Sequence, residues 1–250
     1  MKKLLTILFA SVMLVGACIG FSACGNSSDY NRILEKGTLV VGVTVYKPMD
    51  YLDENDEWTG FDAEIAEMMA EEWGVKAQFV IINWANKVAE LNSKAIDVVW
   101  NGMTASDELG QQIDFSVAYA ENRQVAVIKT ENAGRINSLE AVKASSIAVE
   151  RESAGDTVAT EEIQGSNISR VAAQVDAVLE VDAGTSETAI IDYTMAKSVV
   201  GEGEFADLTI VDPDVVSFGR EVFAVGLRKG SDLTEKINAL YKKYYEDGTL

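Results

Sequence analysis

Polar residues that could hold a charged ligand follow two similar apolar segments of the sequence. Segment 94–101 runs from a helix end through an acid and an apolar strand to Asn101 and then Gly102, and segment 185–192 follows the same order to Asp192. Ligands of open α/β sheets bind outside the carboxyl ends of strands, so two facing units would place these residues on opposite walls of one cleft. There, an aspartate makes a charge-assisted hydrogen bond with a cation. A chance similarity between two α/β strands is the alternative.

The composition removes most catalytic and metal chemistry. Histidine is absent from the 250 residues, which excludes Ser-His-Asp and Cys-His catalysis and histidine-ligated zinc. The two cysteines, Cys18 and Cys24, both lie near the N-terminus, so we expect neither a disulfide in the fold nor a cysteine metal site. The 40 acidic and 21 basic residues give a net charge of −19, which disfavours nucleic-acid binding. We therefore expect no metal, no cofactor and no nucleic-acid partner.

Residues 1–23 have the form of a secretory signal peptide, with a positive start and an apolar run up to Phe21. The tetrapeptide ending at Cys24 resembles the lipobox of bacterial lipoproteins, in which the cysteine is lipidated after cleavage, and Cys18 is a second candidate. Residues 24–29 would form a short tether. We expect a protein tied to the outer side of the cytoplasmic membrane, and an uncleaved membrane-spanning helix is the alternative.

The rest of the chain alternates strand-like and helix-like segments, which indicates a parallel α/β sheet. The strand-like segments are rich in β-branched residues, and the helix-like segments carry apolar residues at helical spacing. The expected strands are 38–45, 76–82, 96–100, 124–128, 146–149, 188–191 and 221–228. The expected helices are 28–36, 62–73 with Asp62 as its cap, 86–93, 138–142, 153–163, 172–181 and 233–245.

Several short motifs follow one another in an order typical of one protein family. They lie at residues 42–49, 58–66, 82–84, 96–104, 114–116, 118–119, 122–125 and 246–249. Each motif alone is weakly specific, whereas their order and spacing over about residues 30–250 are specific. On this basis the chain resembles the extracellular solute-binding proteins of the polar amino acid ABC-transporter type.

The resemblance implies an α/β fold of the periplasmic-binding-protein-like type II, a two-lobed clamshell with a mixed, mostly parallel sheet and flanking helices in each lobe. Lobe 1 would comprise residues 30–122 and return at 216–250, and lobe 2 would comprise residues 123–215. Two strands, near 120–125 and 211–218, would form the hinge. Family members continue past the final Asp-Gly-Thr motif with another helix, so either this helix is missing or the sequence given stops short of it.

The resemblance also assigns ligand-binding positions. Tyr46 and Trp84 would hold the ligand between two rings by stacking and cation–π attraction. The loop through Gly102 and Thr104 would offer a carbonyl to the ligand ammonium and an amide and hydroxyl to its carboxylate, while Asp192 would bind the α-ammonium. The alternatives are a turn tyrosine, a core tryptophan, a plain strand-end loop and a helix-capping aspartate.

Two positions depart from the family pattern where the ligand carboxylate would be held. Leu109 replaces the usual arginine, and Glu152 replaces the glycine of a turn that donates amides. Three interpretations stay open. Arg151 or Ser153, at a helix start, could take the carboxylate; the ligand could be a cationic amine without a carboxylate, held by Asp192 and Glu152; or a one-residue slip could leave Glu152 and Leu109 outside the cleft.

The implied function is solute capture rather than catalysis. We expect a monomeric receptor that closes around an amino acid or a related amine and presents the closed form to a membrane-embedded ABC permease. An enzyme similar to cyclohexadienyl dehydratase, with Asp192 and Glu152 as acids, is one alternative. A sensor domain of a membrane receptor is another.

Overall fold

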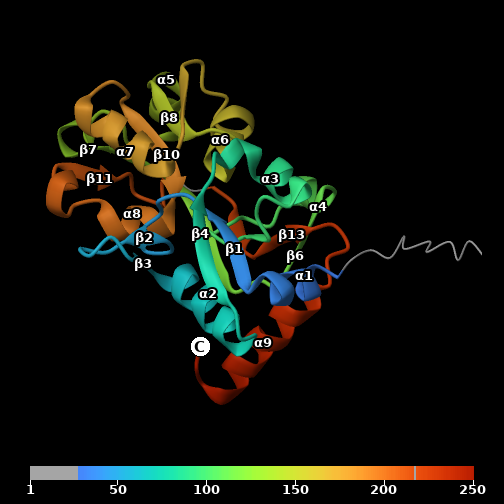
Figure 1. The fold of residues 1–250 in the computed structure, drawn as a ribbon. Helices are drawn as coiled ribbons and strands as arrows, with labels where there is room; N and C mark the ends of the chain where they lie inside the picture. Colours follow the sequence, from blue (N-terminus) through green and yellow to red (C-terminus); the bar gives the residue numbers. More distant parts are fainter. Residues whose placement is uncertain (1–27, 217) are drawn as a thin grey trace, which may run out of the picture.

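The computed structural model describes residues 28–216 and 218–250 as two lobes, each built around one mixed sheet with helices packed on it (Figure 1). The expected signal peptide (1–23), the lipidation candidates Cys18 and Cys24, and residues 24–27 of the tether lie outside the described residues. None of the helices that the described residues form is long and apolar enough to cross a membrane.

The first lobe has the strand order β4-β1-β5-β13-β6. Strand β1 is parallel to β4 and β5, whereas β13 is antiparallel to β5 and β6. Its elements are α1 (Asp29–Lys36), β1 (Thr38–Val43), β2 (Tyr51–Leu52), β3 (Trp58–Thr59), α2 (Phe61–Glu72), β4 (Lys76–Ile81), the 3-10 turn Trp84–Asn86, α3 (Lys87–Ser93), β5 (Val98–Val99), α4 (Asp107–Gly110), β6 (Ile113–Phe115), β13 (Gly226–Arg228) and α9 (Leu233–Asp247).

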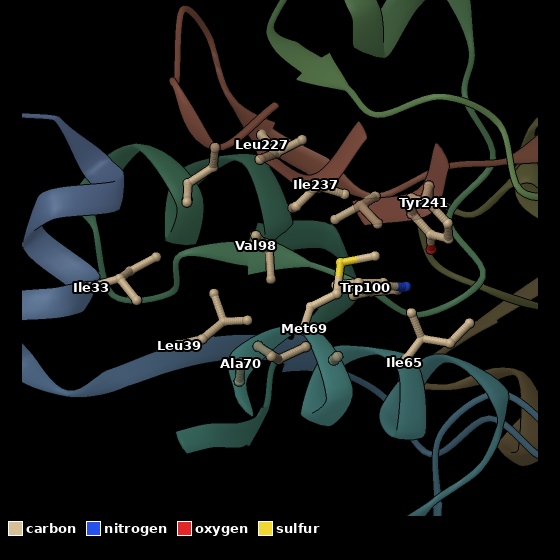
Figure 2. Close-up of a cluster of buried hydrophobic side chains, with 14 of the residues drawn as sticks. Ile33, Leu39, Ile65, Met69, Ala70, Val98, Trp100, Leu227, Ile237 and Tyr241 are labelled. Carbon is tan, nitrogen blue, oxygen red and sulfur yellow. The ribbon is translucent and has the colours of Figure 1, made fainter. Parts of the chain in front are cut away.

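The core of this lobe lies between the sheet and the helices α2 and α9 (Figure 2). Met69 of α2 and Tyr241 of α9 meet around Trp100, which follows β5 and is fully buried. Burial of one such large side chain contributes about 1.5–3 kcal/mol to the free energy of unfolding. The helical spacing of apolar residues that predicts α2 and α9 therefore also fixes the faces that they bury.

One cluster of buried charges in this lobe is paired. Asp97 is fully buried, and it accepts hydrogen bonds from Arg32, Lys36 and the backbone N–H of Val40. Arg228 donates from Nε to Asp29 at 3.0 Å and lies within 3.8 Å of Asp97. This cluster joins α1, the segment before β5 and the returning strand β13.

The second lobe has the strand order β11-β7-β10-β8-β9. Strand β10 is parallel to β8 and antiparallel to β7, and β8 is parallel to β9. Its elements are β7 (Ala120–Lys129), the 3-10 turn Thr130–Asn132, α5 (Leu139–Ala144), β8 (Ile147–Glu150), α6 (Ala154–Thr157), the π-helical turn Val158–Glu162, β9 (Ile168–Val171), α7 (Gln174–Ala183), β10 (Thr188–Asp192), α8 (Tyr193–Val199), the 3-10 turn Gly203–Phe205 and β11 (Leu208–Ile210).

The lobes are joined by β7 and by β12 (Arg220–Phe223), which pair in antiparallel register from Arg123–Arg220 to Ala120–Phe223. The sequence predicts the second hinge strand at 211–218, whereas the strand that joins the lobes is β12, which begins at Arg220. Val211 and Val216 are instead buried in the core of the second lobe. Because that core holds these apolar side chains, the crossing strand forms only after them.

Three local expectations were wrong. The cap of α2 is Gly60 and has no side-chain bond, because Asp62 is turned inward and accepts from the Gly102 N–H and the Tyr119 hydroxyl. The helix expected at 153–163 divides into α6 and the π-helical turn. Strand β9 was not foreseen, and the strand expected at 221–228 divides into β12 and β13.

Candidate ligand-binding site

Two neighbouring cavities lie between the lobes. The inner cavity has a volume of about 30 Å³, and the outer cavity has a volume of about 860 Å³. Lys87, Thr104 and Leu109 of the first lobe and residues 152–154 of the second lobe line both. The inner volume suits a water molecule, whereas the outer volume is in the range of small-molecule sites.

Most of the residues predicted from the sequence line the inner cavity. The structure brings together Trp84, Asn101, Gly102, Thr104, Glu152, Ser153 and Asp192. Two others are not among them. Tyr46 is 1% exposed and packs edge-on against Phe223, with the ring centroids 6.3 Å apart. Arg151 is exposed and donates to the carbonyl of Arg170 at 3.5 Å.

The loop after β5 is held rigidly by Asn101. Its side-chain amide donates to the Thr44 carbonyl at 3.0 Å and to Asp50 at 2.7 Å, and its oxygen accepts from the Thr44 N–H. Gly102 follows with φ +55°, and a Cβ there would lie 2.5 Å from the Tyr46 ring. The buried tyrosine therefore supports the loop from behind, and Asn101 positions it rather than offering free groups to a ligand.

Asp192 stands at the end of β10 and is 3% exposed. Its Oδ1 accepts from Asn122 at 2.5 Å and from Gln124 at 2.6 Å, and its Oδ2 accepts from Gln174. Although it precedes α8, its side chain makes no capping bond. Burial raises the pKa of Asp192, and the hydrogen bonds from Gln174 and Gln124 oppose that rise.

A second carboxyl group, Glu221, shares the donors of Asp192. The amides of Asn122 and Gln124 each donate to Glu221 Oε1 as well as to Asp192 Oδ1. Burial and then the charge of Asp192 raise the pKa of Glu221 to about 7. Since Asn122 and Gln124 lie on β7 and Glu221 on β12, both joining strands contact the strand-end aspartate.

The cation of the inner cavity is Lys87, at the start of α3. Its Nζ donates to the Trp84 carbonyl at 3.3 Å and across the cleft to the Glu152 carbonyl at 3.0 Å, and it lies 5.0 Å from the Trp84 ring centroid. Burial lowers the pKa of Lys87, while Glu152 and Glu150 raise it. Leu109, which replaces the usual arginine of the family, brings no charge to this cavity. Lys87 supplies a positive charge there.

Glu150 ends β8 inside the same cavity. It is 2% exposed, and its Oε1 has no hydrogen-bond partner among the described residues. Burial and then the charge of Asp192 raise the pKa of Glu150, and Lys87 opposes the rise. Sequence reasoning missed Lys87, Glu150, Gln174 and Glu221; the one signal available was that Glu150 follows a strand expected to end at residue 149.

The two departures from the family pattern both face the cleft. Leu109 and Glu152 line both cavities, so the interpretation in which a register slip removes them is wrong. Glu152 has φ +57°, a conformation that glycine adopts without strain. Ser153 accepts from the Asp156 N–H and so caps the short helix α6. The turn therefore keeps a geometry suited to glycine while carrying a glutamate.

The arrangement can bind charge on both sides of a small solute. One ammonium group and several carboxyl groups meet an indole ring in a cleft between two bodies that a strand pair joins. Across the described residues there is no cluster of three or more Asp, Glu, Cys or His side chains able to hold a metal ion. The chemistry on offer is ion pairing and hydrogen bonding.

The chain is similar to several known proteins. The family model of the bacterial extracellular solute-binding proteins, family 3, matches residues 39–250. The chain is 29% identical over 243 residues to the L-cystine-binding protein TcyJ of Escherichia coli K12, covering 96% of this chain and 90% of that protein. It is 30% identical to the arginine-binding extracellular protein ArtP of Bacillus subtilis, covering 96% and 93%.

A solved structure has the same fold. It is an amino acid ABC transporter substrate-binding protein from Streptococcus pneumoniae bound to L-arginine, with a TM-score of 0.81 and 25% identity. The likeness covers 89% of this chain and 94% of that chain. The expected two-lobed, type II fold is thereby confirmed.

Proposed function

Because this chain belongs to the bacterial extracellular solute-binding proteins, family 3, we propose that it captures an α-amino acid between its lobes and delivers it to the permease of an ABC importer. Proteins of this family act outside the cytoplasm, and we place this one there. Its chemistry is binding, with no reaction on the solute. We propose that residues 30–122 with about 219–250 form one lobe, that residues 123–218 form the other, since Val216 lies in the core of the second lobe, and that the protein is a monomer.

The observation that carries the proposal is the opposition of Lys87 and Asp192 across one cavity. Lys87 comes from the first lobe and Asp192 from the second, and both are buried. A zwitterion between them would place its carboxylate toward Lys87 and its ammonium toward Asp192. Such a solute favours the closed state because it contacts both lobes.

Lys87 is the cation that could hold the ligand carboxylate in place of the arginine that Leu109 replaces. Arg151, the first replacement considered for the missing arginine, does not line the cavity, and Ser153 lines it but carries no charge. An amine without a carboxylate would leave the buried Lys87 ammonium without an anionic partner. Lys87 therefore favours an amino acid over the amine alternative.

Entry of the solute requires the lobes to part. An amino acid is much larger than the water-sized inner cavity, and the bond from Lys87 to the Glu152 carbonyl links the two lobes there. The pair β7–β12 is the connection about which the lobes would rotate. Ligand then replaces the bond from Lys87 to Glu152 with bonds of its own to both lobes.

Calorimetric titration of the protein, first unfolded and refolded to remove any bound solute, tests the proposal. We expect one or more of arginine, lysine, glutamine, histidine and cystine to bind, and the α-amide of the same solute to bind at least about tenfold more weakly because it cannot pair with Lys87. Asp192→Asn should weaken binding similarly, whereas Arg151→Gln should not. Equal binding of acid and amide, or no binding of any of these amino acids, would contradict the proposal.

We also propose that Cys24 carries a lipid that ties the receptor to the membrane. The support is the small residues before Cys24 and the polar residues after it. Expression in a bacterial host with Cys24→Ser should move the protein from the membrane fraction to the soluble extracytoplasmic fraction, while Cys18→Ser should leave it in the membrane. Membrane retention of the Cys24 variant would refute the anchor.

A further inference from the structure

An unpartnered carboxyl group, that of Glu150, lines the ligand cavity. Its side chain lines the cavity and is buried, yet Oε1 has no hydrogen-bond partner among the described residues. Buried polar atoms in proteins are almost always hydrogen-bonded, and an unpartnered one costs stability unless something supplies the missing partner. Because Glu150 lines the cavity, a bound ligand is in a position to provide the missing hydrogen-bond partner.

The neighbours of Glu150 do not supply that partner. Lys87, the nearby cation, donates its hydrogen bonds to the carbonyls of Trp84 and Glu152. None of the ion pairs formed by the described residues includes either Glu150 or Lys87. Asp192 lies close enough to add a like charge.

A simple zwitterion therefore leaves one buried carboxyl group of the cavity without a partner. The ammonium of such a solute would pair with Asp192 and its carboxylate with Lys87, and Glu150 would stay buried without a cation. A second positive charge on the solute would remove that cost. The Trp84 ring, which already has the Lys87 ammonium over its face at 5.0 Å, adds a surface that attracts cations.

We propose that Glu150 receives a positively charged side chain, so that the solute of this protein is an α-amino acid with a cationic side chain. This inference rests on the proposed function and names its substrate class. The same geometry disfavours neutral amino acids. A neutral side chain would leave the buried Glu150 carboxyl group without a partner, so such a solute should bind less tightly than a cationic one.

The test compares two nearly isosteric solutes, arginine and citrulline, which differ in the charge of the side chain. We expect the wild-type protein to bind arginine about ten- to hundredfold more tightly than citrulline, the range for a hydrogen bond to a charged group. In Glu150→Gln the preference should fall below about threefold, chiefly through weaker arginine binding. Glu131→Gln, an exposed change that removes the same charge, should keep the wild-type preference.

The possible results distinguish a failure of this inference from a failure of the proposed function. If citrulline and arginine bind equally to the wild type, Glu150 is no cation site and the inference is overturned while the proposed function stands. If Glu150→Gln weakens both solutes equally, Glu150 acts by supporting Lys87, and the inference is again overturned. If no amino acid binds, the proposed function itself fails. The comparison of arginine with citrulline on the wild-type protein needs no variant, so it tests the inference even if Glu150→Gln does not fold.

Discussion

Replacing Glu221 by glutamine should remove a large part of the pH dependence of stability. Glu221 and Asp192 share the amide donors of Asn122 and Gln124, so the two carboxyl groups cannot both ionise without repulsion. Glutamine keeps an oxygen that can accept from both amides while it removes the ionisable group. The change therefore isolates the titration from the loss of hydrogen bonds.

The magnitude follows from the pKa of Glu221, which burial raises from 4.5 to about 7. An acid whose pKa is higher in the folded state binds its proton more tightly there, so its contribution to stability is greatest at low pH and is lost as the pH rises through about 7. With 1.36 kcal/mol for each pKa unit, the wild type should lose about 2.5 kcal/mol between about pH 5 and about pH 8 because of this residue.

Urea unfolding followed by tryptophan fluorescence at these two pH values measures the effect. The free energy of unfolding should fall by about 2.5 kcal/mol more in the wild type than in Glu221→Gln. Asp62, whose pKa burial also raises to about 7, titrates in both proteins and cancels in the comparison. Equal losses in the two proteins would show that Glu221 ionises in the folded state as freely as in the unfolded chain, and would refute the reasoning.

Three further changes test the cleft and its supports. Lys87→Gln should weaken amino acid binding at least about tenfold in calorimetry while binding of the α-amide stays unchanged. An equal loss for both solutes would show that Lys87 does not bind the ligand carboxylate. Gly102→Ala should lower the free energy of unfolding by about 1–3 kcal/mol, because φ is +55° and the new Cβ would meet the Tyr46 ring; unchanged urea unfolding would contradict this. Asp97→Ala should cost about 3–5 kcal/mol in the same assay, since it strips buried or half-buried cations, Arg228 among them, of their partner. A loss below about 1 kcal/mol would mean that solvent compensates those cations.

Local patterns predicted many of the elements that carry the site. Ser28 caps α1 and Gly37 ends it in the left-handed conformation, as the residue types suggest. The strand-end rule placed Asn101 and Asp192 at one cleft because their strands point their carboxyl ends toward the same gap. These successes share a cause, since caps, strand periodicity and strand ends depend on neighbours within a few residues.

Side-chain direction and packing explain why two of the predicted residues do not line the inner cavity. Successive side chains of a strand point to opposite faces, so at the end of β8 Glu150 turns into the cavity and Arg151 turns to solvent. Sequence reasoning chose Arg151 for its charge and could not see which face it would take. Tyr46 was likewise expected on the ligand, but its ring fills the space behind Gly102.

The sequence by itself determined the family, the alternation of strands and helices, and the absence of histidine chemistry, because composition and short-range order fix these properties. Only the tertiary structure decided that Lys87, Glu150 and Asp192 line one cavity and that Glu221 shares the hydrogen-bond donors of Asp192. They come from α3, β8, β10 and β12, separated by tens of residues, and they meet because two sheets pack across a shared strand pair. Long-range packing of this kind sets which charges are buried together, and the buried charges decide what the cleft can hold.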